Sequence, residues 1–234
     1  MVKLYQKYLY MESEYFKEFN MDDVIPLSKI LVIGVKDSRH EHIIADLLEN
    51  YDDDFICDSI VINPKGNILT KLYPSININN YYSSEVIMTN LYNGKRNAII
   101  RYIDDYNNQD VIFNTMMHNS KYYKKDIIVV TQDLVSFPMS VIDQFDYIFI
   151  SHFDNEYDQT KLYFSYGKVF PTFNVFQNAL NGVTCSGELL VIKNFDDNAI
   201  DKVFWYTIPE IDFSELPDNN EEIYYESEYL TVYI

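Results

Sequence analysis

The residues that could bind a phosphate follow an apolar run, Ile30–Gly34, which leads into a short polar loop and then an amphipathic segment. This strand–loop–helix order is the setting of a P-loop, in which backbone N–H groups and a lysine hold the phosphates of a nucleotide. The usual pattern is G-x-x-x-x-G-K-[ST]. Laid from the first glycine, it places Arg39, His40 and Glu41 where the second glycine, the lysine and the hydroxyl residue should stand.

Each of these three replacements works against nucleotide binding. Arg39 adds a side chain where glycine would let the backbone approach a phosphate. His40 is shorter than lysine and mostly neutral near pH 7, and Glu41 brings negative charge to a site meant for triphosphate. The sequence therefore predicts that tight ATP binding is lost and that no cofactor is bound.

Partial substitutes remain in the same loop. A degenerate cofactor-binding loop can be drawn from Gly34, Lys36, Ser38 and Arg39. Lys36 and Ser38 are out of register with the pattern, but the N-terminus of the following helix is still an anion site in principle. An active enzyme of unorthodox design could therefore use Lys36 or a lysine of a partner, and Mg-ATP would then be its cofactor.

Polar residues end two further apolar runs. Asp104 and Asp105 follow the run that begins at Ala98, and Gln132 follows Ile127–Thr131. In P-loop enzymes a carboxylate pair at a strand end holds Mg²⁺ and activates water, and a polar residue on an additional strand lies between the two sites. Alone, each would be an ordinary strand-end turn. Their order behind the phosphate loop makes them vestigial catalytic candidates.

Apolar runs alternate with helical patterns along the chain, which favours an α/β fold with a mainly parallel central sheet covered on both faces. Residues 1–23 are expected to form an N-terminal arm or helix, 24–210 one domain, and 211–234 an acidic tail, with 74–83 irregular. Expected strands are Ile30–Gly34, Ala98–Asp105, Ile127–Thr131, Tyr147–Ser151, Leu189–Lys193 and Val203–Tyr206, with a further apolar run at Phe55–Asn63. Expected helices are His42–Asn50, Glu85–Tyr92, Gln109–His118, Glu156–Tyr166 and Phe173–Leu180.

The composition limits the classes of partner. Lys and Arg number 18 against 36 Asp and Glu, a formal charge of −18, and such a surface repels a nucleic acid backbone. The basic cluster Lys121–Lys125 is read as a solvated turn. The spacings of the His and Cys residues match no metal motif. No apolar run approaches the length of a spanning helix, so no membrane contact is expected.

The order of these pieces resembles the genome-packaging ATPases of large nucleocytoplasmic DNA viruses, in the FtsK/HerA-like branch of P-loop motors. The carriers of the likeness, spread over roughly residues 20–210, are Ile30–Gly34, Ile99–Asp105, Met117–Tyr123, Ile127–Gln132, Pro138, Gln144–Phe149, Gly167–Pro171, Phe173 and Val203–Tyr206. The resemblance implies a RecA-like P-loop three-layer sandwich, a ring-forming ancestor, a viral source and a setting of DNA translocation.

The departure at the phosphate loop leads to the prediction of a degenerate member, a pseudo-ATPase that serves as a structural or interaction module in virion assembly or genome packaging. Its expected partner is a packaging ATPase subunit or a basic virion protein. It is expected in the virion or at a viral assembly site in the host cytoplasm, and an oligomer is compatible with it. Two alternatives stay open: an active motor subunit for DNA translocation, and an unrelated α/β binding protein.

Overall fold

A computed structural model describes residues 16–34, 39–106, 110–195 and 202–210. These residues build one sheet of nine strands in the order β1-β9-β8-β7-β2-β6-β5-β3-β4. The strands are β1 (Lys17–Glu18), β2 (Lys29–Ile33), β3 (Ile60–Ile62), β4 (Asn77–Asn79), β5 (Asn97–Tyr102), β6 (Lys125–Thr131), β7 (Tyr147–Ile150), β8 (Leu189–Lys193) and β9 (Val203–Tyr206).

In the part of the sheet that runs from β7 to β4, each strand is parallel to the next one. At the other end, β8 pairs antiparallel with both β7 and β9, and β1 joins β9 in parallel. The strands β2, β6 and β5 are adjacent in the middle of the sheet, as their continuous apolar sequences predict. Every residue of β2 and β6 is buried, because both faces of the sheet are covered.

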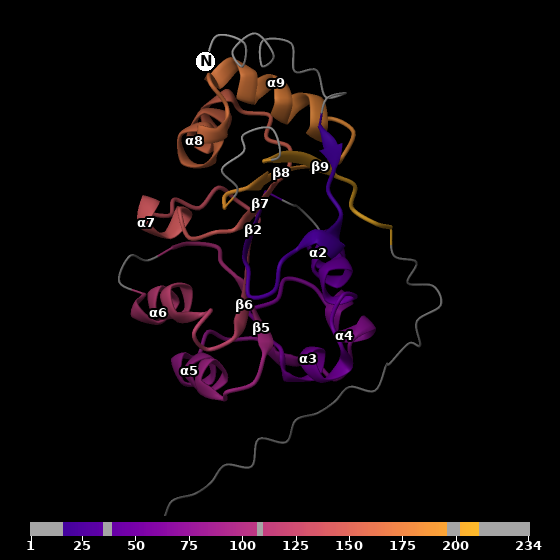
Figure 1. The fold of residues 1–234 in the computed structure, drawn as a ribbon, viewed down its shortest axis with the longest axis vertical. Coiled ribbons are helices and arrows are strands. Elements are labelled where there is room, and N and C mark those ends of the chain that lie inside the picture. Colours follow the sequence, from indigo (N-terminus) through magenta and orange to yellow (C-terminus); the bar gives the residue numbers. More distant parts are fainter. Residues whose placement is uncertain (1–15, 35–38, 107–109, 196–201, 211–234) are drawn as a thin grey trace, which may run out of the picture.

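Helices cover the two faces in separate layers, which the end-on view of the sheet in Figure 1 makes plain. One layer holds α2 (Arg39–Leu48), α3 (Asp53–Asp58) and α4 (Ile68–Leu72), with the 3-10 turn η2 (Met21–Asp23). The opposite layer holds α5 (Ser84–Tyr92), α6 (Val111–Asn119), α7 (Met139–Ile142), α8 (Glu156–Tyr166), η3 (Gly167–Val169) and α9 (Phe173–Thr184).

Two apolar clusters fill the spaces between the sheet and these layers. Alternate residues of one strand enter different clusters: Ile100 of β5 packs on the α2 side, and Ile99 on the α6 side. The mixed α/β fold with a mostly parallel central sheet is therefore confirmed. Strand and helix predictions from the apolar pattern agree with the structure at β2, β5, β6, β7, β8 and β9 and at α2, α5, α6, α8 and α9.

Within the segment 1–23, Lys17–Glu18 pair with β9 as an edge strand, and residues 1–15 lie outside the described residues. Two local predictions need correction. The stretch 74–83 is not wholly irregular, because it contains β4. The first half of the apolar run Phe55–Asn63 is helical, since the Asp52 side chain accepts a hydrogen bond from the Phe55 backbone N–H at 2.8 Å and so caps α3.

Candidate functional site at the carboxyl edge of the sheet

The residues predicted to act together follow three adjacent parallel strands. Gly34 follows β2, Gln132 follows β6 and Asp104 follows β5 by two residues. The Gly34 N–H donates to the Thr131 carbonyl at 2.9 Å, so the ends of β2 and β6 lie side by side. The carboxyl ends of such strands converge at one edge of an open sheet, and these residues share that edge.

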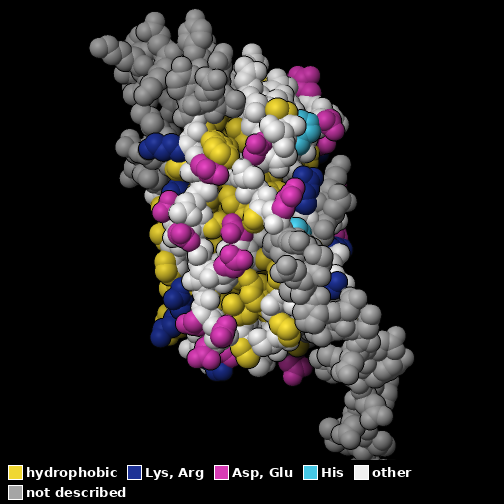
Figure 2. Space-filling model, turned by 90° about the vertical axis from the view of Figure 1, so that its right-hand side faces the viewer, with side chains coloured by type: hydrophobic (Ala, Val, Ile, Leu, Met, Phe, Trp, Pro, Cys, Tyr) yellow, Lys and Arg dark blue, Asp and Glu magenta, His cyan; other side chains and the backbone are white. Residues whose placement is uncertain are grey.

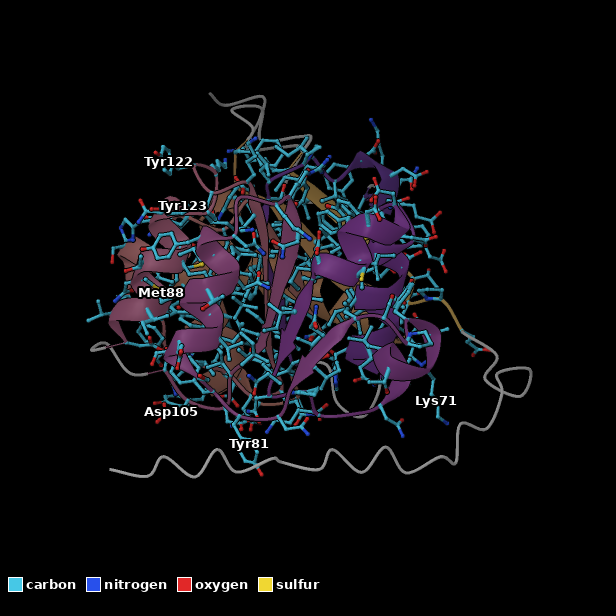
Figure 3. All side chains as sticks on the ribbon, turned by 90° about the horizontal axis from the view of Figure 1, so that it is seen from below. Lys71, Tyr81, Met88, Asp105, Tyr122 and Tyr123 are labelled. Atoms are coloured by element: carbon cyan, nitrogen blue, oxygen red, sulfur yellow. The ribbon has the colours of Figure 1, made fainter. Side chains whose placement is uncertain are left out.

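Figure 3 shows the sheet from the end that carries β3 and β4. Asp105 and Tyr81 lie toward one end of the strands, whereas Tyr122 and Tyr123 lie toward the opposite end. Of the predicted cofactor loop, Lys36 and Ser38 lie outside the described residues.

The first glycine of the loop is covered by an aromatic ring. Gly34 has a positive φ of 78°, a conformation that glycine adopts without the steric penalty of a side chain. A methyl group on Gly34 would lie only 2.4 Å from Cε2 of Phe153, which belongs to the segment after β7. The Phe153 ring therefore occupies the space immediately beside the start of the degenerate loop.

At the start of α2, two of the three residues that depart from the P-loop pattern are buried. His40 and Glu41 are 1% and 0% exposed, whereas Arg39 is exposed. The His40 ring packs edge-on against the Tyr102 ring of β5, with 5.1 Å between centroids. The position that carries the phosphate-binding lysine in a P-loop is thus a core position here.

Glu41 does not carry charge into a phosphate site, contrary to the expectation from sequence. Its Oε2 accepts a hydrogen bond from the Ile68 backbone N–H at 2.7 Å. Gly66 allows this approach, because a Cβ there would lie 2.6 Å from the same oxygen. Burial raises the pKa of Glu41, which the hydrogen bond from Ile68 partly offsets. Glu41 therefore binds the loop between β3 and α4 to the start of α2.

That loop brings Lys65 to Asp104, which follows β5 by two residues. Lys65 Nζ lies 2.6 Å from Asp104 Oδ2, with the two side chains 30% and 59% exposed. Pairs this exposed contribute little to stability, but the ammonium group does neutralise the carboxylate that a P-loop enzyme would turn toward Mg²⁺. Asp105 is exposed and Gln132 is half-buried.

One local pattern indicates the position of Lys65, and no local pattern indicates that of Phe153. The stretch Asn63–Asn67 reads as a turn directly after an apolar run, so Lys65 could have been placed at the carboxyl edge once that run was recognised as a parallel strand. Phe153 comes from a distant part of the chain, and only the pairing of β7 with β2 brings it near Gly34.

Metal-binding clusters and membrane-spanning helices can be assessed for the described residues alone. Among them, no group of three or more His, Cys, Asp or Glu side chains is arranged to hold a metal ion. Within the same ranges, no helix has both the length and the apolar character to cross a membrane.

Comparison with known proteins finds similarity to two viral proteins. No protein-family model matches it. It is 29% identical over 120 residues to the uncharacterized protein L437 of Acanthamoeba polyphaga mimivirus, a match over 49% of this chain and 42% of that protein. It is 23% identical over 215 residues to the uncharacterized protein 075L of Invertebrate iridescent virus 6, covering 81% of this chain and 80% of that protein.

Among solved structures, the genome packaging NTPase B204 of Sulfolobus turreted icosahedral virus 2, in complex with AMPPCP, matches with a TM-score of 0.56 and 10% identity, over 80% of this chain and 100% of B204. The DNA-packaging ATPase B204 of Sulfolobus Turreted Icosahedral Virus matches with a TM-score of 0.54 and 12% identity over the same shares. The chain thus has the mixed α/β fold of P-loop NTPases, and its structural neighbours are viral genome-packaging NTPases.

Proposed function

We propose that this chain is a catalytically degenerate relative of viral DNA-packaging ATPases that acts as a structural or interaction module in genome packaging or virion assembly. The fold supports the packaging context, and the relatives from a mimivirus and an iridescent virus support a viral setting. The virion or a viral assembly site in the host cytoplasm is the proposed location.

The observation that carries the proposal is the use of the carboxyl edge by the protein's own groups. The Lys65 ammonium group lies on Asp104, and Phe153 lies beside Gly34. Glu41, which stands at the hydroxyl position of the P-loop pattern, is buried and accepts a hydrogen bond from the Ile68 backbone N–H. A nucleotide would have to displace at least the first two of these contacts.

In this account the predicted site residues are vestigial. Asp104, Asp105 and Gln132 keep the places of the catalytic groups, and the degenerate loop keeps the place of the phosphate cradle. The domain of residues 24–210, with flanking segments 1–23 and 211–234, is proposed as the unit that carries this function. No tightly bound cofactor is expected.

An active ATPase is the second candidate, and two observations support it. Structures of B204 were obtained in complex with AMPPCP and with ATP-gammaS. Lys65 contacts Asp104 at the carboxyl edge. A lysine that replaces the missing P-loop lysine would therefore not have to come from the degenerate loop. Binding of Mg-ATP at micromolar concentration would favour this candidate. The similarity to the fold of P-loop NTPases disfavours the third candidate, an unrelated α/β binding protein.

Protein contacts are the proposed mode of action, with a packaging ATPase subunit or a basic virion protein as the partner. B204 is a genome packaging NTPase. If this chain acts beside such an enzyme, an oligomer that includes it is compatible with the proposal. The charge of −18 disfavours direct contact with nucleic acid.

We expect the purified chain to leave duplex DNA free at physiological salt. The reason is the unfavourable field of 36 acidic against 18 basic side chains. Fluorescence anisotropy of a labelled duplex, titrated at about 50 and about 150 mM salt, measures this directly. Retention of the duplex at the higher salt concentration would count against a module that acts through protein contacts.

A further inference from the structure

A cavity lies at the edge of the sheet opposite the candidate site. It has a volume of about 590 Å³. Pro26 lies shortly before β2 and Arg96 directly before β5, so the cavity is at the amino ends of the parallel strands. We call it the amino-edge pocket; it is lined by Met21, Asp22, Val24, Pro26, Leu47, Asn50, Tyr51, Asp52, Asp54, Phe55, Asp58, Lys95 and Arg96.

The wall of the amino-edge pocket contains an aromatic platform that already receives a guanidinium group. The rings of Tyr51 and Phe55 are stacked, with centroids 3.9 Å apart and an interplanar angle of 8°. The guanidinium carbon of Arg96 lies 5.5 Å from the centroid of each ring. Because the two centroids are only 3.9 Å apart, Arg96 sits at the side of the stacked pair. Aromatic rings attract such cations, arginine more often than lysine.

The charges around this platform are predominantly negative. Four aspartates line the pocket against Lys95 and Arg96, and Lys95 is paired with Asp58 at 2.6 Å. Behind the platform, the Tyr51 hydroxyl donates to Oδ1 of Asp126 at 3.3 Å. Asp126 is 2% exposed, and its Oδ2 accepts no hydrogen bond from the described residues. A cationic group in the pocket would gain from this field.

Figure 2 looks onto the face that carries α2, α3 and α4, where acidic side chains are spread with hydrophobic atoms between them. A phosphate-bearing ligand is disfavoured by these charges, and so is a second copy of a chain with a charge of −18. An arginine side chain matches both features of the pocket, since it stacks on aromatic rings and pairs with carboxylates.

We propose that the amino-edge pocket binds arginine side chains of a basic segment of a partner protein. This inference rests on the proposed function, in which the chain acts through protein contacts, and it assigns that contact to a defined surface. Arg96 is the internal stand-in for the incoming guanidinium group, and the partner's arginine competes with it for the Tyr51–Phe55 platform.

The test uses the full-length chain and a fluorescent nine-residue peptide with four arginines, measured by anisotropy at about 150 mM salt. The variant Asp22→Asn/Asp54→Asn removes two exposed charges from the pocket rim. The matched control Asp23→Asn/Asp53→Asn removes the same charge from exposed neighbours that do not line it. Circular dichroism verifies that both variants fold.

We expect the pocket variant to bind about tenfold more weakly and the control to change by about twofold or less, because exposed charge pairs act at short range. An Arg96→Ala variant should bind about threefold more tightly, since the platform is vacated. Equal losses in both double variants, weaker binding by Arg96→Ala, or no binding of the peptide by the unmodified chain would each overturn the proposal.

Failure of this inference is distinguishable from failure of the proposed function. Neither nucleotide nor DNA enters the peptide assay, so a negative result removes the assigned surface and leaves the degenerate site to its own test. Conversely, tight Mg-ATP binding would refute the degenerate function while the peptide result stood.

Discussion

We expect the Gly34→Ala variant to lose about 3 kcal/mol of unfolding free energy, and the Gly94→Ala variant to lose about 1 kcal/mol. Both glycines have positive φ, 78° and 73° respectively, so alanine carries a similar backbone penalty at each. They differ in their surroundings. A Cβ on Gly94 would meet nothing within 4 Å, whereas one on Gly34 would lie 2.4 Å from the Phe153 ring.

Urea unfolding of the two variants measures this difference, and a double-mutant cycle assigns it. In a Phe153→Ala background, the further cost of Gly34→Ala should fall to that of Gly94→Ala, because the ring that meets the new methyl group is gone. Equal costs at the two glycines in the unmodified chain would mean that Phe153 does not lie beside the loop.

The second large effect concerns Lys125 at the start of β6. Its side chain is fully buried, and Nζ donates to the Asn93 side chain at 2.6 Å and to the Lys95 carbonyl at 2.5 Å. Burial lowers the pKa of Lys125 from 10.5 to about 8. These contacts also hold the turn that presents Arg96 to the amino-edge pocket.

Between pH 8 and 10.5 the unfolded chain holds a proton on Lys125 that the folded chain has released. Because of Lys125, the free energy of unfolding therefore increases as the pH rises through this window, by up to roughly 3 kcal/mol. The cost of the buried charge is fully present below pH 8. A Lys125→Met variant lacks this titration, so its stability relative to the unmodified chain should decline across the same window.

Denaturant unfolding at pH 7.5, 9 and 10.5 checks the expectation, and Lys124→Met serves as the control because Lys124 is exposed next to it in sequence. Other groups titrate in all three chains and cancel in the differences. A stability difference between Lys125→Met and the unmodified chain that stays constant from pH 7.5 to 10.5 would contradict the lowered pKa.

The sequence predicted the central sheet because its strands carry the signal locally. In β2, β5 and β6 the apolar runs are continuous, and burial on both faces requires this. The edge strand β1 has two residues, too few for any periodicity, and it forms only through its pairing with β9. The helix α3 resembled a strand because Phe55 and Ile56 continue into the apolar residues of β3.

The sequence indicates where the strands end, and the parallel order of β2, β6 and β5 brings Gly34, Gln132 and Asp104 to one edge of the sheet. The contacts at that edge could not be predicted from the sequence. The ion pair of Lys65 with Asp104 joins residues 39 positions apart, and the inward turn of Glu41 depends on space left by Gly66. Such contacts follow from packing between elements, which no local pattern specifies.

The central claim, that the carboxyl edge no longer takes a nucleotide, is tested most directly by isothermal titration calorimetry with Mg-ATP at millimolar concentration. The account predicts no saturable binding, because Lys65, Glu41 and Phe153 are engaged within the protein and the lysine and hydroxyl positions of the loop are replaced. Saturable binding with a micromolar Kd would contradict it, and Lys36→Ala and Lys65→Ala variants would then show which lysine meets the phosphates.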